Sequence, residues 1–448
     1  MRGRVNQDLT ADVILNLGRA FGSYLGSSKT VVVGRDPRTS GNMFSMAAIS
    51  GLNSVGVNVI DIGMVPTPAL CYLVPKLKTD GGFMITASHN PPEWNGVKVI
   101  TREGTAPLPD QEIEIERIYF DRSFKSVDWS NLGQAGDRSS ALGEYIDDLI
   151  ARFTGLPVDS SGFTVAIDGG GGANSSVTPS VLRRLGCDTR TINCVTDGFF
   201  SGRPPEPKIE TLTEFARMCA ELRVDFGVAH DGDGDRAVFV DGEGKIYLGD
   251  RTFALNCYWA LRDKPGETIV TNIATSSIIH DVAEAVKAKV ELTPVGEPQI
   301  VQKMKETKAL VGGEENGSFI WREWSLTRDG VLASVAMLDL MIKTRKSLPE
   351  LDSLFPKRSQ VKAGIDCSGD LLLPIMRKIR DDIPDAEEVI LVDGIRLGFA
   401  DREWVLIRPS GTEHKIRVFS EASTETRAQE LNGLGMSLTR KAIEELAT

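Results

Sequence analysis

Short β-branched runs recur along this chain, and each group of three predicted strands ends in a polar loop that contains glycine or proline. Helical stretches separate the strands. The strands are expected over 30–33, 57–61 and 82–85, then 163–167, 189–192 and 226–229, and finally 268–270, 290–292 and 309–311. This alternation is typical of open α/β units with mostly parallel sheets. The pattern therefore predicts three similar α/β domains.

Polar loops follow the third strand of each group. They run over 86–91, 231–236 and 313–317, and offer a hydroxyl with an imidazole, three carboxylates, and a pair of carboxylates. In open α/β sheets, the loops beyond the carboxyl ends of the strands carry the chemistry. We therefore expect the three loops to serve one shared cleft.

The chain changes character after about Val361. Strands are expected over 388–392, 404–407 and 416–419, followed by a helix over 424–445, which indicates a smaller α+β domain. A stretch with Pro349 and Pro356 precedes it, so this domain could move as a unit. The predicted domains are 1–150, 151–249, 250–356 and 357–448.

Composition narrows the class of protein. Of 448 residues, 41% are hydrophobic and 25% charged, as in globular proteins. A net charge of −11 argues against a nucleic-acid surface. No apolar run approaches the ~20 residues that span a bilayer, and the N-terminus lacks an apolar signal core. Six scattered cysteines favour a reduced, cytoplasmic chain. From the charge and the lack of apolar runs, we expect the chain to contact neither nucleic acid nor membrane.

Ser88 and His89 lie in a turn that Pro91 and Pro92 impose. One interpretation is that Ser88 and Asn90 only cap backbone N–H groups. A hydrolase nucleophile is the other, although the Gly-x-Ser-x-Gly motif is missing. This loop alone leaves both interpretations open.

Asp231, Asp233 and Asp235 alternate with glycines directly after a predicted strand. Three carboxylates converge when a cation lies between them, and oxygen ligands select a hard cation such as Mg²⁺ or Ca²⁺. The segment does not match the helix-loop-helix calcium motif, which requires glycine at its sixth position and glutamate at its twelfth. Here these positions are Arg236 and Gly242. A solvated acidic turn is the alternative.

The segment from Arg408 to Arg417 combines hydroxyls, a glycine turn and guanidinium groups at both ends. Such a loop can bind an anion, because backbone N–H groups and arginines both grip phosphate. An ordinary hairpin with a solvated charged face is the alternative. Nucleoside-triphosphate and zinc-protease motifs are missing from the sequence.

Taken together, these segments resemble the α-D-phosphohexomutase superfamily in order and spacing. The segments over 86–91, 231–236, 313–317 and 408–412 are similar to its phosphoserine, metal, sugar and phosphate loops, and 34–41 and 95–98 also match. The resemblance covers nearly the whole chain. It implies four domains around a central cleft, three similar α/β domains with mixed, mostly parallel sheets and a C-terminal α+β domain.

The resemblance also implies a role for each matching residue. Ser88 would carry the exchanged phosphoryl group, and Mg²⁺ would be bound by an oxygen on Ser88 together with Asp231, Asp233 and Asp235. Lys98 and Arg2 would assist proton transfer, and His89 and Arg236 would line the site. Glu314 and Asn316 would hold sugar hydroxyls. The phosphate that does not react would be held by Arg408, Ser410, Gly411, Thr412 and Arg417.

Two departures from the family pattern affect these expectations. The chain opens at Met1-Arg2-Gly3, so the family's first strand is expected to be shortened or missing. Asn316 stands where many members have serine, and Gly-Glu-Glu-Asn-Gly resembles the archaeal-type phosphoglucosamine mutases. We therefore expect a Mg²⁺-dependent phosphoglucosamine mutase that uses a hexose or hexosamine 1,6-bisphosphate as activator and intermediate.

Alternatives remain in three classes. A phosphomannomutase/phosphoglucomutase would use the same mechanism, and a metal-dependent sugar phosphatase would use the same residues. A sugar-phosphate or cation-binding protein without turnover is the third. The expected partner is a small-molecule sugar phosphate, and a monomer or a homodimer is expected.

Overall fold

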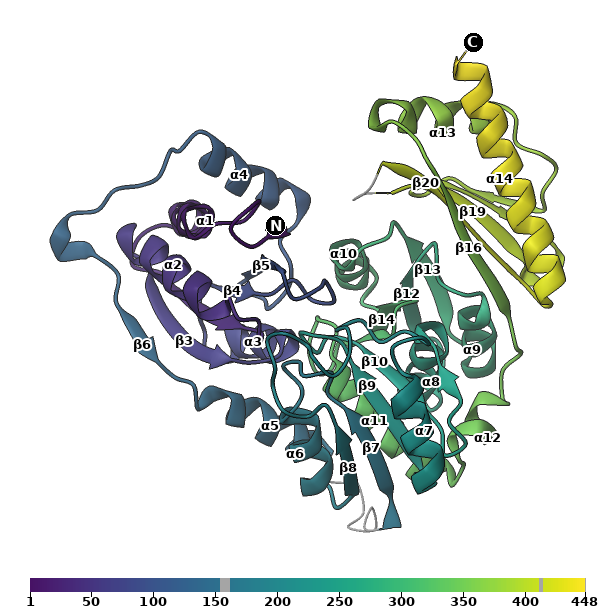
Figure 1. Ribbon diagram of the computed structural model, residues 1–448, viewed down its shortest axis with the longest axis horizontal. Helices are drawn as coiled ribbons and strands as arrows, with labels where there is room; N and C mark the ends of the chain where they lie inside the picture. The colour runs from purple at the N-terminus through teal and green to yellow at the C-terminus, as the bar shows by residue number, and fades with distance from the viewer. Residues whose placement is uncertain (154–161, 411–413, 448) are drawn as a thin grey trace. The chain divides into compact units, whose positions relative to one another are not determined.

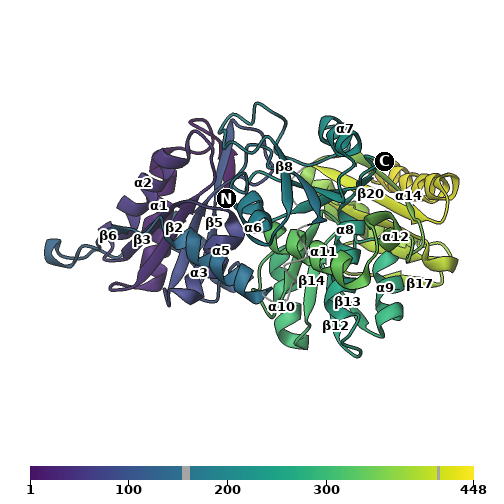
Figure 2. The ribbon, with the colours of Figure 1, turned by 90° about the horizontal axis from the view of Figure 1, so that it is seen from below.

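The computed structural model describes residues 1–153, 162–410 and 414–447. The chain divides into two compact units, which combine Met1–Ala260 with Asn316–Asp352 and Leu261–Glu315 with Ser353–Thr448. Figures 1 and 2 show the helices and strands of both units. The four-domain bounds expected from the sequence stay a prediction.

The first unit begins with a six-stranded sheet in the order β1-β5-β4-β2-β3-β6. Its strands are β1 (Arg2–Arg4), β2 (Thr30–Arg35), β3 (Asn58–Met64), β4 (Gly81–Ile85), β5 (Trp94–Thr101) and β6 (Ala135–Asp137). Its helices are α1 (Ala11–Leu25), α2 (Gly41–Ser54), α3 (Thr67–Lys76), α4 (Pro109–Phe120), η1 (Trp129–Asn131) and α5 (Ala141–Arg152).

Neighbouring glycines in β4 show that helices cover both faces of this sheet. A Cβ on Gly81 would lie 2.8 Å from the ring of Phe21 in α1, whereas one on Gly82 would lie 2.8 Å from Leu70 and Val74 in α3. Successive residues of a strand point to opposite faces. The first sheet is therefore the middle layer of an α/β/α sandwich.

The second sheet of the first unit has the order β11-β10-β9-β7-β8. Its strands are β7 (Thr164–Asp168), β8 (Asp188–Ile192), β9 (Phe226–His230), β10 (Ala237–Val240) and β11 (Ile246–Tyr247). The unit also contains α6 (Val177–Arg184), α7 (Thr213–Leu222), α8 (Gly249–Leu261), β15 (Ser318–Trp321), α11 (Gly330–Thr344) and α12 (Leu348–Asp352).

Helix α11 is mostly apolar, and its residues from Gly330 to Met341 are buried. A helix with this composition belongs in the core. Asp329 caps its first turn by accepting from the N–H groups of Val331 and Leu332. The same buried carboxylate also accepts bonds from the Tyr145 hydroxyl and the Trp324 indole, so the start of α11 is fixed from three directions.

The second unit contains a parallel β13-β12-β14 arrangement and a five-stranded antiparallel sheet in the order β16-β20-β19-β18-β17. The first part holds β12 (Thr268–Asn272), α9 (Ile278–Val286), β13 (Lys289–Thr293), α10 (Glu297–Thr307) and β14 (Val311–Glu314). The second part holds β16 (Ser359–Asp366), η3 (Gly369–Leu371), α13 (Leu372–Asp381), β17 (Glu388–Ile390), β18 (Ile395–Gly398), η4 (Ala400–Arg402), β19 (Trp404–Pro409), β20 (Lys415–Ala422) and α14 (Glu425–Ala447).

A fully buried carboxylate, Glu421 of β20, joins these two parts of the second unit. It accepts a bond from the backbone N–H of Ser277, just before α9, and further bonds from the Trp404 indole and the Gln360 amide. Ile273 and Ala274 pack against Trp404 in the same hydrophobic cluster. Polar and apolar contacts thus both connect the antiparallel sheet to the parallel strands.

The expected α/β class and the C-terminal α+β domain are confirmed, with three local corrections. The strand expected over 309–311 is β14, which starts at Val311 and includes Gly313 and Glu314. The strand expected over 388–392 ends at Ile390. Strands β5 and β10, which follow the Ser88 and Asp231 loops, were not among the expected strands. Both are antiparallel to the strand before them, because a short connection cannot cross over to a parallel strand.

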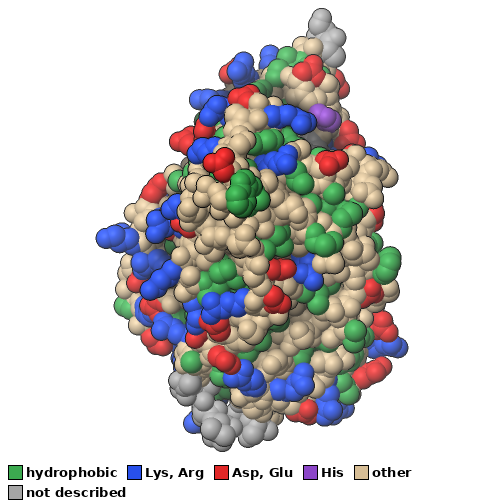
Figure 3. Space-filling view, turned by 90° about the vertical axis from the view of Figure 1, so that its left-hand side faces the viewer, with side chains coloured by type: hydrophobic (Ala, Val, Ile, Leu, Met, Phe, Trp, Pro, Cys, Tyr) green, Lys and Arg blue, Asp and Glu red, His purple; other side chains and the backbone are tan. Residues whose placement is uncertain are grey.

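The surface in Figure 3 carries Lys/Arg and Asp/Glu side chains interspersed over one face. The acidic excess of the chain is therefore not gathered on that face. Among the described residues, no helix is long and apolar enough to cross a membrane. All six cysteines are free thiols.

Candidate active site

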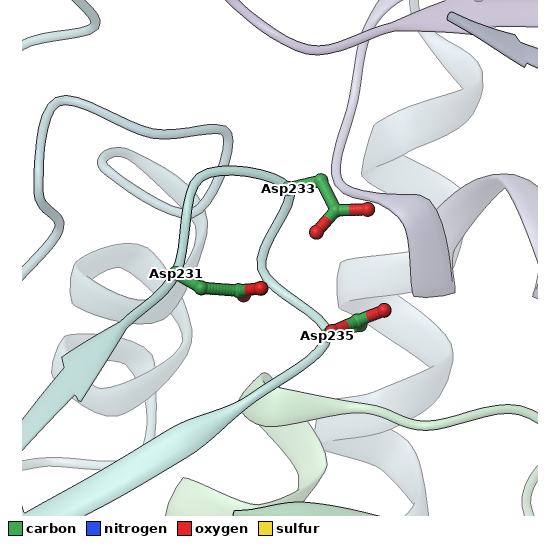
Figure 4. A group of neighbouring side chains, drawn as sticks. All are labelled: Asp231, Asp233 and Asp235. Carbon is green, nitrogen blue, oxygen red and sulfur yellow. The ribbon is translucent and has the colours of Figure 1, made fainter. Parts of the chain in front are cut away.

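Three buried carboxylates converge in the loop between β9 and β10. Asp231, Asp233 and Asp235 each offer an oxygen, and these oxygens all lie within 4.8 Å of one another (Figure 4). The antiparallel β9-β10 pairing brings both ends of the loop back to the same edge of the sheet. The alternative of a solvated acidic turn is wrong, because all three residues are at most 1% exposed.

One oxygen of each of two carboxylates is occupied by donors. Asp233 Oδ2 accepts from Thr67 Oγ1 at 2.5 Å and from Lys98 Nζ at 2.7 Å. Asp235 Oδ2 accepts from Lys98 Nζ at 3.0 Å and from Arg328 Nη2 at 2.7 Å. The remaining oxygens, Asp233 Oδ1 and Asp235 Oδ1, are buried and accept no hydrogen bond.

Buried carboxylate oxygens that accept no hydrogen bond are costly, unless a cation binds them. The guanidinium nitrogen Arg236 Nε lies 3.8 Å from Asp235 Oδ1, which is too far for a hydrogen bond. Two such oxygens beside Asp231 form an all-oxygen donor set, which suits a hard divalent cation. The residues present therefore fit a Mg²⁺-type site, and the donors on the Oδ2 atoms determine which oxygens are available to it.

Cations balance the carboxylates around this site. Burial alone would raise the pKa of the Asp233 carboxyl, but Lys98 and Thr67 hold it well below its ordinary value. Arg328 and Lys98 likewise outweigh burial and lower the pKa of Asp235. Burial and the two neighbouring carboxylates raise the pKa of Asp231 to about 8. A proton on Asp231 therefore competes with a metal ion for this carboxylate.

Ser88 reaches this triad from the loop after β4. Its Oγ lies 3.1 Å from Asp231 Oδ2 and 3.4 Å from His89 Nδ1. Arg236 Nη2 donates to the same His89 Nδ1 at 3.1 Å, so that nitrogen is an acceptor and the ring proton lies on Nε2. Burial and the Arg236 charge lower the pKa of His89 to about 4, which keeps it neutral at pH 7.

The backbones of the two loops also meet. A Cβ on Gly232 would lie 2.5 Å from the Ser88 carbonyl oxygen, which is too close for any side chain. Glycine at this position therefore allows the metal loop to lie directly against the backbone of Ser88. The structure thus brings Ser88, His89, Lys98, Arg236 and the three aspartates together.

Arg2 lies on the short first strand, which the structure shows as β1. Arg2 pairs with Gly96 across β1 and β5, and its Nη1 donates to Asn90 Oδ1 at 2.9 Å. The side chain therefore contacts the loop that carries Ser88. The first strand is therefore present, over Arg2–Arg4.

In the second unit, Glu314 and Arg408 are linked through two short segments. Glu314 Oε1 accepts from Asn272 Nδ2 and from the N–H of Gly296. Arg408 Nη2 lies 2.9 Å from Asp393 Oδ2, which also accepts from the N–H of the neighbouring Val295. This arrangement joins the sugar-loop and phosphate-loop candidates within one unit.

Two arginines face each other at the predicted phosphate loop. Arg408 and Arg417 are register partners across β19 and β20, so their side chains lie side by side on one face of the hairpin. Ser410 donates its N–H to the Lys415 carbonyl as the hairpin turns. Gly411 and Thr412 lie outside the described residues. Asn316, in the first unit, accepts from the N–H of Ser318 through Oδ1.

Thr67 and Arg328 were missed at the sequence level. Thr67 lies in Pro66-Thr67-Pro68, which reads as the start of a helix. Arg328 precedes Asp329, which reads as a helix N-cap. In the sequence, only their position beside proline or at a helix start distinguishes them, and neither signal points to a metal loop.

The chain matches four family descriptions in order. Domain I of "Phosphoglucomutase/phosphomannomutase, alpha/beta/alpha" matches residues 1–126, domain II 143–244 and domain III 248–358, and the C-terminal domain matches 368–433.

Relatives match over nearly their full length. A "Probable phosphoglucosamine mutase" of Methanopyrus kandleri is 38% identical over 100% of this chain and 98% of its own. A "Phosphoglucomutase/phosphomannomutase" of Thermococcus kodakarensis is also 38% identical, over 99% and 98%. A "Phosphoglucosamine/phosphogalactosamine mutase" of Sulfurisphaera tokodaii is 38% identical over 96% of both chains.

A crystal structure of a phosphoglucomutase/phosphomannomutase family protein from Burkholderia thailandensis has the same fold. It superimposes with a TM-score of 0.85 at 26% identity, covering 98% of this chain and 96% of the other. Fold, ordered motifs and full-length relatives agree, and the chain therefore belongs to the phosphoglucomutase/phosphomannomutase family, whose members are phosphohexomutases.

Proposed function

We propose that this chain is a Mg²⁺-dependent mutase that interconverts the 6- and 1-phosphates of a hexosamine or hexose, with glucosamine phosphate preferred. Ser88 carries the exchanged phosphoryl group. The observation that supports this most is the 3.1 Å distance between Ser88 Oγ and Asp231 Oδ2, beside two buried carboxylate oxygens without hydrogen-bond partners. A hydroxyl placed there can exchange a phosphoryl group next to a bound cation.

Asp231, Asp233 and Asp235 would hold the Mg²⁺. When bound, Mg²⁺ neutralises charge on the transferring phosphoryl group. Lys98 and Arg328 hold the Oδ2 atoms of Asp233 and Asp235, so the other oxygens stay oriented. Since no covalent chemistry other than phosphoryl transfer is needed, alignment and charge balance supply most of the stabilisation.

His89 would line the site beside Ser88. Its Nδ1 lies 3.4 Å from Ser88 Oγ, and the lone pair of this nitrogen accepts from Arg236 Nη2. Lys98 Nζ donates to carboxylate oxygens of both Asp233 and Asp235. Its part in proton transfer, like that of Arg2, stays a prediction.

The catalytic cycle would pass the phosphoryl group from Ser88 to the sugar phosphate, giving a 1,6-bisphosphate, and return the other phosphate to Ser88. Glu314 and Asn316 would hold sugar hydroxyls, while Arg408, Arg417 and the loop between them would hold the second phosphate. Two relatives whose names include phosphoglucosamine support the amino sugar, while the Thermococcus kodakarensis name supports a phosphoglucomutase/phosphomannomutase as the alternative.

The test compares kcat/KM for glucosamine, mannose and glucose 6-phosphates, with ribose 5-phosphate as an outlier, in the presence and absence of Mg²⁺. Ser88→Ala is assayed with added bisphosphate. Ser45→Ala is its control, because Ser45 is a buried serine in α2 whose hydroxyl has no hydrogen-bond partner. We expect the first variant to lose activity and the second to keep it.

Other results would contradict the proposal in distinct ways. Stoichiometric release of free phosphate would indicate a phosphatase. Tight binding of sugar phosphates without turnover would indicate a binding protein. Full mutase activity in Ser88→Ala would exclude Ser88 as the phosphoryl carrier.

A further inference from the structure

The backbone of Ser88 adopts an uncommon conformation. Its φ is +53°, in the left-handed region, where a residue with a side chain is strained by about 1–2 kcal/mol. Such strain persists only where the surroundings hold the residue in place. Both peptide groups of Ser88 are held: Thr86 Oγ1 accepts from its N–H at 2.8 Å, and Arg38 Nη2 donates to its carbonyl at 2.9 Å.

Arg38 lies in the loop after β2 and is 2% exposed. Its two terminal nitrogens donate only to backbone carbonyls of one loop. The acceptors are Ser88 at 2.9 Å and Asn90 at 2.7 Å for Nη2, and Pro91 at 2.6 Å and Trp94 at 2.8 Å for Nη1. One planar group with donors in fixed directions therefore sets the path of the chain from Ser88 to the start of β5.

Asp36 completes a closed ring of hydrogen bonds. Its Oδ2 accepts from Arg38 Nε at 3.0 Å and from Thr86 Oγ1 at 2.7 Å, and the Thr86 oxygen in turn accepts from the Ser88 N–H. Asp36 and Arg38 have fully buried side chains, so their charges neutralise each other away from water. The ring of Phe200 lies 5.0 Å from the guanidinium and covers it further.

We propose that Arg38 is a positioning residue for phosphoryl transfer. With Asp36 and Thr86, it holds the Ser88 backbone in the left-handed conformation that directs Oγ to Asp231. The proposal rests on the proposed function of Ser88 as phosphoryl carrier. Misplacing a reacting atom by about 1 Å can cost about 100-fold in rate, so loss of this support should act on catalysis more than on substrate binding.

The main test uses Arg38→Lys, because lysine keeps the buried charge but cannot reach four carbonyls at once. Arg396→Lys is the matched control: Arg396 is a buried arginine of the second unit that also donates to a carbonyl, that of Ile273. The full-length proteins are incubated with glucose 1,6-bisphosphate, and phosphate on Ser88 is followed by intact mass. Hydrogen exchange of the peptides over 86–95 and steady-state kinetics are measured in parallel.

For Arg38→Lys we expect phosphoryl loading and kcat to fall about 100-fold, KM for the sugar phosphate to change by less than about threefold, and exchange over 86–95 to accelerate. Arg396→Lys should load at the wild-type rate. A folded Arg38→Lys protein with wild-type loading and exchange would overturn the proposal. An Arg38→Lys protein whose Tm falls while its phosphoryl loading and kcat stay at the wild-type level would also overturn it.

A second pair of variants tests the same ring if Arg38→Lys does not fold. Thr86→Val removes the acceptor for the Ser88 N–H, and Thr86→Ser retains it. Slow loading in the first and recovery in the second supports the proposal, whereas equal loading in both overturns it. If the wild type itself never loads phosphate on Ser88, the proposed function fails; hydrogen exchange then still shows whether the ring holds the loop.

Discussion

Thr67 should control how tightly the aspartate triad binds a metal ion. Its hydroxyl donates to Asp233 Oδ2 at 2.5 Å, and its N–H donates to the Asp233 carbonyl at 2.9 Å. With Oδ2 fixed in this way, Asp233 Oδ1 remains the oxygen available to a cation. Thr67→Val keeps the shape of the side chain and the backbone bond but removes the hydroxyl donor.

The structure sets the size of this effect. Thr67 is 3% exposed and Asp233 is fully buried, so water cannot replace the missing donor. A hydrogen bond to a charged group contributes about 1.5–3 kcal/mol. Since about 1.4 kcal/mol corresponds to a factor of ten, Mg²⁺ should bind about 10–100-fold more weakly, in line with the usual cost of removing a partner of a metal ligand.

Isothermal titration with Mg²⁺ measures the affinity directly, and the Mg²⁺ dependence of kcat provides a second readout. Thr67→Ser should restore most of the affinity. Thr439→Val is the control, because Thr439 is a buried threonine in α14 whose hydroxyl donates to the Gly435 carbonyl of the same helix. A Thr67→Val protein that binds Mg²⁺ as tightly as the wild type would refute the reasoning.

Three further predictions concern other parts of the molecule. Gly232→Ala would place a Cβ 2.5 Å from the Ser88 oxygen, so kcat should fall about 100-fold, whereas Gly143→Ala, with open space around its Cβ, should leave kcat unchanged. Wild-type kcat in the first variant would contradict the close approach. Burial lowers the pKa of His230 to about 4, below its ordinary 6.5. The unfolded chain therefore takes up this proton first as the pH falls from 6.5 to 4, and stability drops by up to about 3 kcal/mol. His230→Gln should show a smaller decrease of Tm over that range, and an equal decrease would count against it. Arg408→Met should raise KM for the sugar phosphate about tenfold, and steady-state kinetics with an unchanged KM would argue against a role in phosphate binding.

The groups that we propose to do the chemistry could be located from the sequence, because their type and local order carry the signal. Asp231, Asp233 and Asp235 lie within five residues, and a strand before them indicates which edge of a sheet they occupy. Ser88 was ambiguous by itself, since a serine before Asn and Pro also caps turns. In the structure its hydroxyl donates to Asp231 Oδ2 at 3.1 Å, which is the contact on which the proposed role of Ser88 rests.

The groups that orient the chemistry could not be predicted in the same way. Thr67 is 166 residues from Asp233 in sequence and Arg328 is 93 from Asp235, so only tertiary packing brings them together. Arg38 belongs to a segment that matches the family, yet nothing local indicates that its donors meet carbonyls some 50 residues away.

The short strand that carries Arg2 illustrates a different limit. Three residues give too little hydrophobic alternation to predict a strand, and the pairing is fixed by β5 instead. Sequence patterns thus predict strands and helices that bury a face of their own side chains. They predict less well a short strand that only pairs with the edge of an existing sheet.

The buried Glu421 carboxylate bears on how this chain can be divided. Four family descriptions match four separate segments, which suggests domains that could be produced separately. A chain ending before Ser359 would nevertheless leave the Ser277 N–H and hydroxyl without their acceptor and would uncover Ile273 and Ala274. An exposed apolar surface beside unpaired polar groups favours aggregation. The C-terminal domain therefore covers an apolar surface of the preceding strands, and we expect a chain without it to aggregate.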